Sequence, residues 1–234
     1  MKKAVWIIAV LQVIVTGVFL RLMPDTVPIH WDIMGRADNF GSKYTYLIMP
    51  AVTAAMVLFL TAMGRPLAKK AEGAQDEKKT AEAVNNIKVM NIVMVSVTVL
   101  MSVIQCYNLY NATRSGKVGA ENLTDNGLGI MVFMMGLMFI VLGNFMPKTK
   151  RNGSIGLRTS SSMYNDTTWR KSNNYAGKAL MIAGVLTVIT ALFTKPAIAI
   201  VLMLVYNITS TVASCVYAKK VYNEEISRSD GKTQ

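Results

Sequence analysis

Six long stretches of this chain contain no Asp, Glu, Lys, Arg or His. Each is long enough, or nearly so, to cross a hydrocarbon core of about 30 Å. Because a spanning backbone must satisfy its own hydrogen bonds, we expect each stretch to be a helix. The sequence therefore predicts an all-α membrane protein with six transmembrane helices, at approximately 4–20, 44–63, 89–110, 127–146, 179–194 and 196–218.

The positive charge is distributed unevenly among the connections. The formal net charge is +12, and roughly three quarters of the 25 Lys and Arg residues fall at the N-terminus, in the second and fourth connections and in the C-terminal tail. Such residues are enriched on the cytoplasmic side of membrane proteins, so we expect both termini to be cytoplasmic. No soluble domain gathers these residues, which favours membrane lipids over direct nucleic-acid binding.

The first outer connection is predicted to contain a short extended segment. Val27, Ile29 and Trp31 alternate with Pro28, His30 and Asp32, and period-two alternation is typical of a strand with one apolar face. Turn-forming residues follow at Gly35, Asp38, Asn39 and Gly41. The residues of this loop that we consider candidates for recognition outside the cell are His30, Trp31, Asp32 and Gly35.

Catalytic and metal-binding chemistry finds little support in the sequence. His30 is the single histidine, whereas a closed zinc site needs about four ligands and a catalytic one about three. The Ser160–Ser162 run is expected on the opposite side of the membrane from His30, so no Ser-His-Asp triad can assemble within one chain. We therefore expect no enzyme activity, no metal and no cofactor.

Turn residues and charge divide the chain into regions. We expect a two-helix N-terminal domain at 1–65, in which Gly64-Arg65-Pro66 ends the second helix because proline disrupts a helix interior. A cytoplasmic linker at 66–88 precedes a four-helix domain at 89–218, and a cytoplasmic tail occupies 219–234. The connection at 147–178, which we call the signature loop, is long and carries apolar residues of its own, as functional connections often do.

Glycines recur at seven-residue spacing on both sides of the signature loop. Small residues at this spacing form a stripe that lets two membrane helices approach closely. If the fourth and fifth helices are antiparallel neighbours, the predicted pairs are Gly143 with Gly177, Gly136 with Gly184 and Gly129 with Ala191.

Several residues in and beside the signature loop resemble the SdpI-type family of bacterial membrane immunity proteins. They are Gly143-Asn144, Lys150, Asn152, Ile155-Gly156-Leu157-Arg158-Thr159, Trp169, Asn173 and Ala176-Gly177-Lys178. Upstream, a second set resembles the N-terminal domain of unknown function that is often fused to it: Leu22-Met23-Pro24, Val27 to Asp32, Gly35, Asp38, Ser42-Lys43 and Pro50.

This resemblance implies a protein of the bacterial cell membrane that protects its cell against a secreted peptide or protein toxin. It also implies a possible signalling role, in which an ArsR-type repressor is held at the membrane by the signature loop. The family usually continues into a Pro-Trp-containing stretch where this chain has Ser160 to Tyr164, which bears on repressor docking more than on the fold. The predicted partner-binding residues are Asn144, Pro147, Asn152, Ile155, Gly156, Leu157, Arg158, Thr159 and Trp169.

Other interpretations of the same residues stay open. Arg158 and Trp169 are residue types that anchor protein interfaces, but the loop's apolar and basic residues could equally rest on the membrane surface. A transporter or channel for a small neutral or lipid-like solute would use buried amides such as Gln105 and Asn207. A membrane enzyme acting at the outer face would use His30, Trp31 and Asp32.

Overall fold

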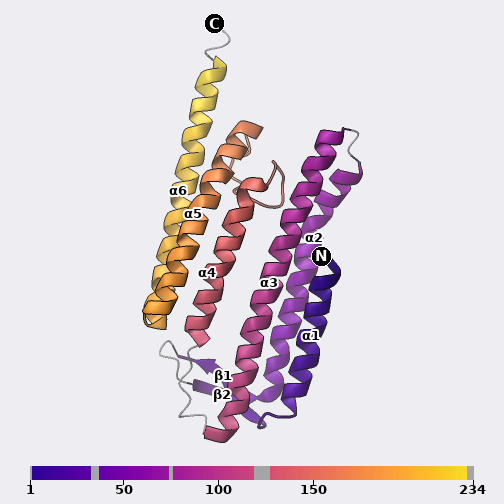
Figure 1. Ribbon diagram of the computed structural model, residues 1–234, viewed down its shortest axis with the longest axis vertical. Coiled ribbons are helices and arrows are strands. Elements are labelled where there is room, and N and C mark those ends of the chain that lie inside the picture. Colours follow the sequence, from indigo (N-terminus) through magenta and orange to yellow (C-terminus); the bar gives the residue numbers. More distant parts are fainter. Residues whose placement is uncertain (1, 33–36, 74–75, 119–126, 231–234) are drawn as a thin grey trace.

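The computed structural model describes residues 2–32, 37–73, 76–118 and 127–230. Within these residues, six helices are long and apolar enough to cross a membrane, which confirms the predicted fold class. They are α1 (Lys2–Leu20), α2 (Ile48–Glu72), α3 (Glu77–Val118), α4 (Gly127–Phe145), α5 (Asp166–Phe193) and α6 (Pro196–Asp230) (Figure 1).

The six helices form two groups of three that lie side by side. α1 and α2 pack against α3, whereas α5 packs between α4 and α6, and α3 also contacts α4 (Figure 1). The start of α1, the end of α2, the start of α3, the signature loop and the end of α6 all point toward one end of the bundle. The first and the last helix thus share a side, and the assignment of that side to the cytoplasm stays a prediction, as does the division into domains.

Most helices extend well beyond the uncharged stretches that revealed them. α5 begins at Asp166 and α6 ends at Asp230, so much of the predicted tail is helical. α2 passes through Pro66 and ends at Glu72, so the prediction that Gly64-Arg65-Pro66 ends this helix was wrong. The carbonyl four residues before a helical proline loses its usual partner, but packing of Leu67 into the core holds the helix together beyond that point.

The first outer connection forms an antiparallel hairpin of β1 (Thr26–Trp31) and β2 (Ala37–Ser42). β1 is the extended segment that the alternation predicted. Asp38, Asn39 and Gly41 lie in the second strand, and not in a turn as expected. Burial in β1 does not follow the predicted alternation, since Val27 and Pro28 are both buried while Ile29 is exposed. Register shifts also occur on both sides of His30.

Two apolar clusters stabilise the N-terminal group of helices at its opposite ends. The cluster near the signature loop joins α1, α2 and α3 through Val5, Val57, Leu60, Leu67, Met90 and Met94. The cluster beneath the hairpin consists of Met23, Val27, Leu109 and Ala112. The hairpin and the signature loop are therefore each attached to one end of the same three helices.

Candidate functional site

The signature loop begins with a tight turn organised by the side chain of Asn152. Its Oδ1 accepts hydrogen bonds from the backbone N–H groups of Ser154, at 2.7 Å, and Ile155, at 2.9 Å. Its Nδ2 donates to the carbonyls of Lys150 and Ile155. An asparagine side chain that bonds nearby backbone groups substitutes for a regular turn, which explains the burial of Asn152 within the loop.

The next turn depends on Gly156 and on the first part of α5. Gly156 has a φ of +105°, a region that side chains other than glycine rarely adopt. A Cβ at this position would lie 2.6 Å from Asn173 Oδ1 and 2.9 Å from the Trp169 ring. That Asn173 oxygen accepts a hydrogen bond from the Leu157 N–H at 2.7 Å. The loop therefore folds back onto α5 so closely that no side chain fits between Gly156 and the helix.

Trp169 lies inside the signature loop and contributes almost no surface. Its side chain is 2% exposed, and its Nε1 donates to the Thr149 carbonyl at 2.9 Å. We expected an interface or membrane-surface anchor, because tryptophan is typical of both. The structure instead uses the indole as the core around which residues 149–165 wrap.

The entry into α5 is fixed by two short polar motifs. Asn165 and Thr168 form a capping box, in which each side chain accepts a hydrogen bond from the backbone N–H of the other. Just before it, the Ser162 hydroxyl donates to the Leu157 carbonyl at 2.7 Å and accepts from the Thr159 N–H at 2.9 Å. These bonds place the loop and the helix start in one rigid unit.

The predicted partner-binding residues differ in how much surface they offer. Asn144, Gly156 and Arg158 are exposed, and the Arg158 guanidinium donates to the Gly153 carbonyl. Pro147, Ile155, Leu157 and Thr159 are half-buried, and Asn152 and Trp169 are buried. Partner binding by these residues stays a prediction, and the exposed members, Asn144, Gly156 and Arg158, are the ones that a partner could contact directly.

The signature loop is also fastened to the N-terminal group of helices. Asn86 Nδ2 donates to the Lys150 carbonyl at 3.1 Å, and its Oδ1 accepts from the Lys150 N–H at 2.8 Å. Asn85 donates to the Lys148 carbonyl, and the Ser154 hydroxyl donates to the Met63 carbonyl at 3.1 Å, next to the helical proline. We call these contacts, together with the packing of Ile155 onto the α1–α3 cluster, the latch.

On its other side, the signature loop is held by the glycine-lined contact between α4 and α5. A Cβ on Gly143 would lie 2.6 Å from the Gly177 carbonyl, and a Cβ on Gly136 would lie 3.0 Å from the Gly184 carbonyl. Two of the predicted pairs are thus confirmed. The third is not, because a Cβ on Gly129 would meet only Pro196, at 3.7 Å, so this close backbone approach is confined to the loop-proximal part of the helices.

At the opposite end of the molecule, a groove lies between the hairpin and the ends of α2 and α3. It has a volume of about 260 Å³ and presents aromatic, aliphatic and amide groups. The residues that line it are Pro28, Ile29, Trp31, Thr45, Tyr46, Ile48, Met49, Gln105 and Asn108. A small groove of mixed apolar and polar character is typical of a recognition site.

The predicted outer-loop residues are only partly brought together. Trp31 lines the groove, whereas exposed His30 makes a 2.6 Å contact from its Nδ1 to Asp38 Oδ1 across the hairpin. Asp38, which the sequence singled out as a turn residue, thus lies next to His30 across the hairpin. Gly35 lies outside the described residues. Among the residues that the structure describes, no group of three or more potential metal ligands occurs.

Buried amides near the groove join helices to one another. Gln105 is 1% exposed, and its Nε2 donates to Thr16 Oγ1 and to the Tyr46 carbonyl, both at 3.0 Å. The Tyr46 hydroxyl in turn donates to the Pro28 carbonyl at 2.7 Å. Hydrogen bonds of this kind fix helix packing in a membrane. They tie the hairpin to α1 and α3.

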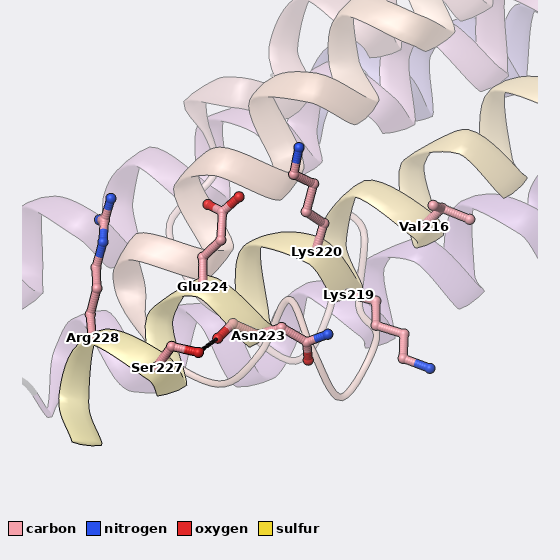
Figure 2. Close-up of a pocket in the computed structure, with 7 residues that line it drawn as sticks. All are labelled: Val216, Lys219, Lys220, Asn223, Glu224, Ser227 and Arg228. Carbon is pink, nitrogen blue, oxygen red and sulfur yellow. Dashed lines mark hydrogen bonds between the residues drawn. The ribbon is translucent and has the colours of Figure 1, made fainter. Parts of the chain in front are cut away.

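A larger hollow, on α6, does not have the form of a site. Figure 2 shows that its seven lining residues all belong to α6, and that their side chains spread outward from a single helix. Their one mutual hydrogen bond joins the Ser227 hydroxyl to the Asn223 carbonyl at 3.0 Å, within the helix itself. This hollow is an open helix face.

Sequence reasoning missed several residues that build the signature loop. Asn86, in the predicted linker, holds the loop from 64 residues away, and Ser162 lies in a serine run for which no structural role was predicted. The Asn165-x-x-Thr168 spacing could have revealed the start of α5, because it is a capping-box pattern. No local pattern points to Asn86.

Comparisons with known proteins give two family matches and one similar curated protein. Residues 148–218 match the SdpI/YfhL protein family, and residues 7–54 match a domain of unknown function, DUF1648. The "Immunity protein SdpI" of Bacillus subtilis (strain 168) is 28% identical over 225 residues, which cover 94% of this chain and 97% of that protein. No solved structure gives a significant match.

Each matched region includes one of the two ends described above. The DUF1648 match includes most of α1, the hairpin and the start of α2, whereas the SdpI/YfhL match includes nearly all of the signature loop, the rest of α5 and most of α6. The resemblance predicted from the sequence is confirmed. The chain is thus a multi-pass cell membrane protein in which a region that matches DUF1648 precedes a region that matches the SdpI/YfhL protein family.

Proposed function

We propose that this protein is an integral membrane immunity protein, which protects its cell against a secreted peptide or protein toxin without catalysing a reaction. The observation that carries the proposal is the similarity to Immunity protein SdpI, which extends over 97% of that protein. Similarity of this extent includes the hairpin, the signature loop and every spanning helix. The whole architecture therefore supports the proposal.

The groove beneath the hairpin is the surface on which we place toxin recognition. Trp31 and Tyr46 supply aromatic walls, and Asn108 supplies an amide at its edge. A groove of about 260 Å³ accommodates one or two apolar side chains of a peptide. The nearby His30–Asp38 pair adds a polar rim that can select among peptides by charge.

Occupation of the groove can be transmitted to the opposite end of the molecule. α2 and α3 both extend from the groove to the latch, since Met49 and Gln105 lie at one end while Met63 and Asn86 lie at the other. A ligand shifts an equilibrium only by its differential affinity for two states. Toxin contact would therefore signal only if it favours one packing of α2 and α3 over another.

A cytoplasmic partner, such as an ArsR-type repressor, would then bind one conformation of the signature loop more tightly than the other. Arg158 is exposed beside the turn at Gly156, and an arginine in such a position suits a protein interface. Because Trp169 is buried, it would act on this partner by holding the loop in shape.

Survival of a toxin-sensitive bacterium tests the proposed function. Cells that express this chain should survive a secreted toxin at concentrations that kill cells carrying the empty vector. Trp31→Ala should remove most of this protection, because it removes a wall of the groove. Tyr44→Ala is the matched control, since Tyr44 is an exposed aromatic residue at the same end that does not line the groove.

Signalling is tested separately with a reporter for a toxin-induced promoter. Arg158→Ala should abolish induction while leaving survival and membrane insertion intact. Full protection by the Trp31→Ala protein would contradict recognition in the groove, and normal induction by the Arg158→Ala protein would contradict docking at the signature loop.

A further inference from the structure

A hollow of about 450 Å³ lies between α5 and α6 near the signature-loop end of the bundle. It is lined by Arg170, Lys171, Asn174, Tyr175, Lys178 and Tyr217. Three of these six side chains are cations and none is an acid. The hollow therefore favours a ligand with negative charge.

The cations of this hollow have no acidic partner within the part of the chain that the structure describes. Asp166, the acid in the first turn of α5, pairs instead with Arg151 of the signature loop, at 3.0 Å. The ion pairs that the structure records leave Arg170, Lys171 and Lys178 unneutralised. Positive charges held together without counterions attract an anion from their surroundings.

The level of the hollow coincides with the boundary between apolar and polar chain. Lys178 directly precedes the uncharged stretch of α5, and Tyr217 lies at the end of the uncharged stretch of α6. The rings of Tyr175 and Tyr217 stack with centroids 4.3 Å apart. Tyrosine is enriched where a membrane meets water, so the hollow lies at the depth of phospholipid headgroups.

An exposed apolar track continues from the hollow along the same face of α5. Lys171, Tyr175 and Lys178 are spaced by four and three residues, and the same spacing continues through Ile182, Val185 and Ile189. Residues at this spacing share one face of a helix. The three aliphatic side chains are 45–61% exposed, so an acyl chain can lie directly along them.

We propose that this hollow binds the headgroup of an anionic phospholipid, with Lys171, Lys178 and Arg170 around the phosphate and an acyl chain on the track of Ile182, Val185 and Ile189. Basic pockets between helices at the cytoplasmic surface bind such headgroups in other membrane proteins. Free phosphate would use the cations but not the track. The inference does not depend on the proposed immunity function.

Lipid titration of the purified full-length protein, followed by native mass spectrometry, tests this site. Dioleoyl phosphatidylglycerol should bind more tightly than dioleoyl phosphatidylcholine, and inorganic phosphate in excess should not displace it. The double variant Lys171→Gln/Lys178→Gln should bind phosphatidylglycerol about tenfold more weakly, because each basic residue near the membrane contributes to attraction of anionic lipid.

Two matched variants distinguish this site from general charge attraction and from loss of the fold. Lys219→Gln/Lys220→Gln removes the same charge from α6 outside the hollow and should change the affinity less than about twofold. Lys171→Arg/Lys178→Arg keeps the charge and should restore binding. Equal weakening by both glutamine pairs, equal binding of the two lipids, or displacement by phosphate would overturn the proposal.

Discussion

Individual residues inside the signature loop decide its shape, and the sequence revealed them only in part. It singled out Trp169 as a residue type that anchors interfaces, and Gly156 only through the family resemblance. It did not reveal that the indole faces inward. The indole donates to the Thr149 carbonyl, 20 residues earlier in the chain, and its ring lies beside Gly156. Neither contact follows from a local pattern.

Replacing Gly156 tests the tight turn at this scale. Gly156→Ala should destabilise the protein by about 1–3 kcal/mol, because the new Cβ would meet Asn173 Oδ1 at 2.6 Å and the backbone has a φ of +105°. Gly153→Ala is the matched control, since a Cβ there meets nothing within 4 Å. Thermal unfolding of both variants in detergent measures the difference. Equal melting temperatures would show that the turn tolerates a side chain.

Replacing Trp169 separates packing from its hydrogen bond. Trp169→Ala should cost about 3–5 kcal/mol, as expected when a large buried aromatic side chain is removed. Trp169→Phe keeps much of the packing but leaves the Thr149 carbonyl without its donor, a loss of about 1–3 kcal/mol. In chemical unfolding, the free energy of unfolding should be highest for the wild type, lower for Trp169→Phe and lowest for Trp169→Ala. A fully stable alanine variant would mean that the ring does not organise the loop.

At the scale of elements, the uncharged stretches predicted how many helices span the membrane but not where those helices end. Hydropathy detects only the part of a helix that lies in lipid. α5 therefore begins before the predicted span, and α2 continues past Pro66, because tertiary packing and capping support the polar turns. The glycine spacing predicted the α4–α5 pairing near the loop, where backbone meets backbone.

The α4–α5 contact should not accept a larger residue at its narrowest point. Gly143→Val would place side-chain atoms against the Gly177 carbonyl and Met181 and should separate the two helices. Gly17→Val on α1 is the control, because a Cβ there meets nothing within 4 Å. Hydrogen exchange along the backbones of α4 and α5 reports the pairing. Exchange in the Gly143→Val protein that stays as slow as in the wild type would contradict this contact.

At the scale of the whole molecule, the latch joins the two groups of helices at the signature-loop end, in addition to the contact between α3 and α4. The sequence could not predict the latch, because its hydrogen bonds join residues of α2 and α3 to the signature loop across 63 to 91 residues. No periodicity or motif links positions so distant. The family resemblance indicated that both regions occur together, but it did not say how they touch.

Loss of the latch should loosen the two groups from each other. Asn86→Ala removes both hydrogen bonds to Lys150 and should destabilise the protein by about 1–3 kcal/mol. Hydrogen exchange should then accelerate at residues 148–155 and leave the α4–α5 contact protected. Asn223→Ala, at an exposed position on α6, is the control. Unchanged exchange in the Asn86→Ala protein would show that the latch does not join the groups.

At residues 148 and 150, the hydrogen bonds of the latch go only to main-chain atoms. Asn85 and Asn86 bond the carbonyls of Lys148 and Lys150, and the Ser154 hydroxyl bonds the Met63 carbonyl. Every amino acid offers that same oxygen. Evolution can therefore change the side-chain charge at these two positions to suit a different partner without breaking the hydrogen bonds that attach the loop to α3.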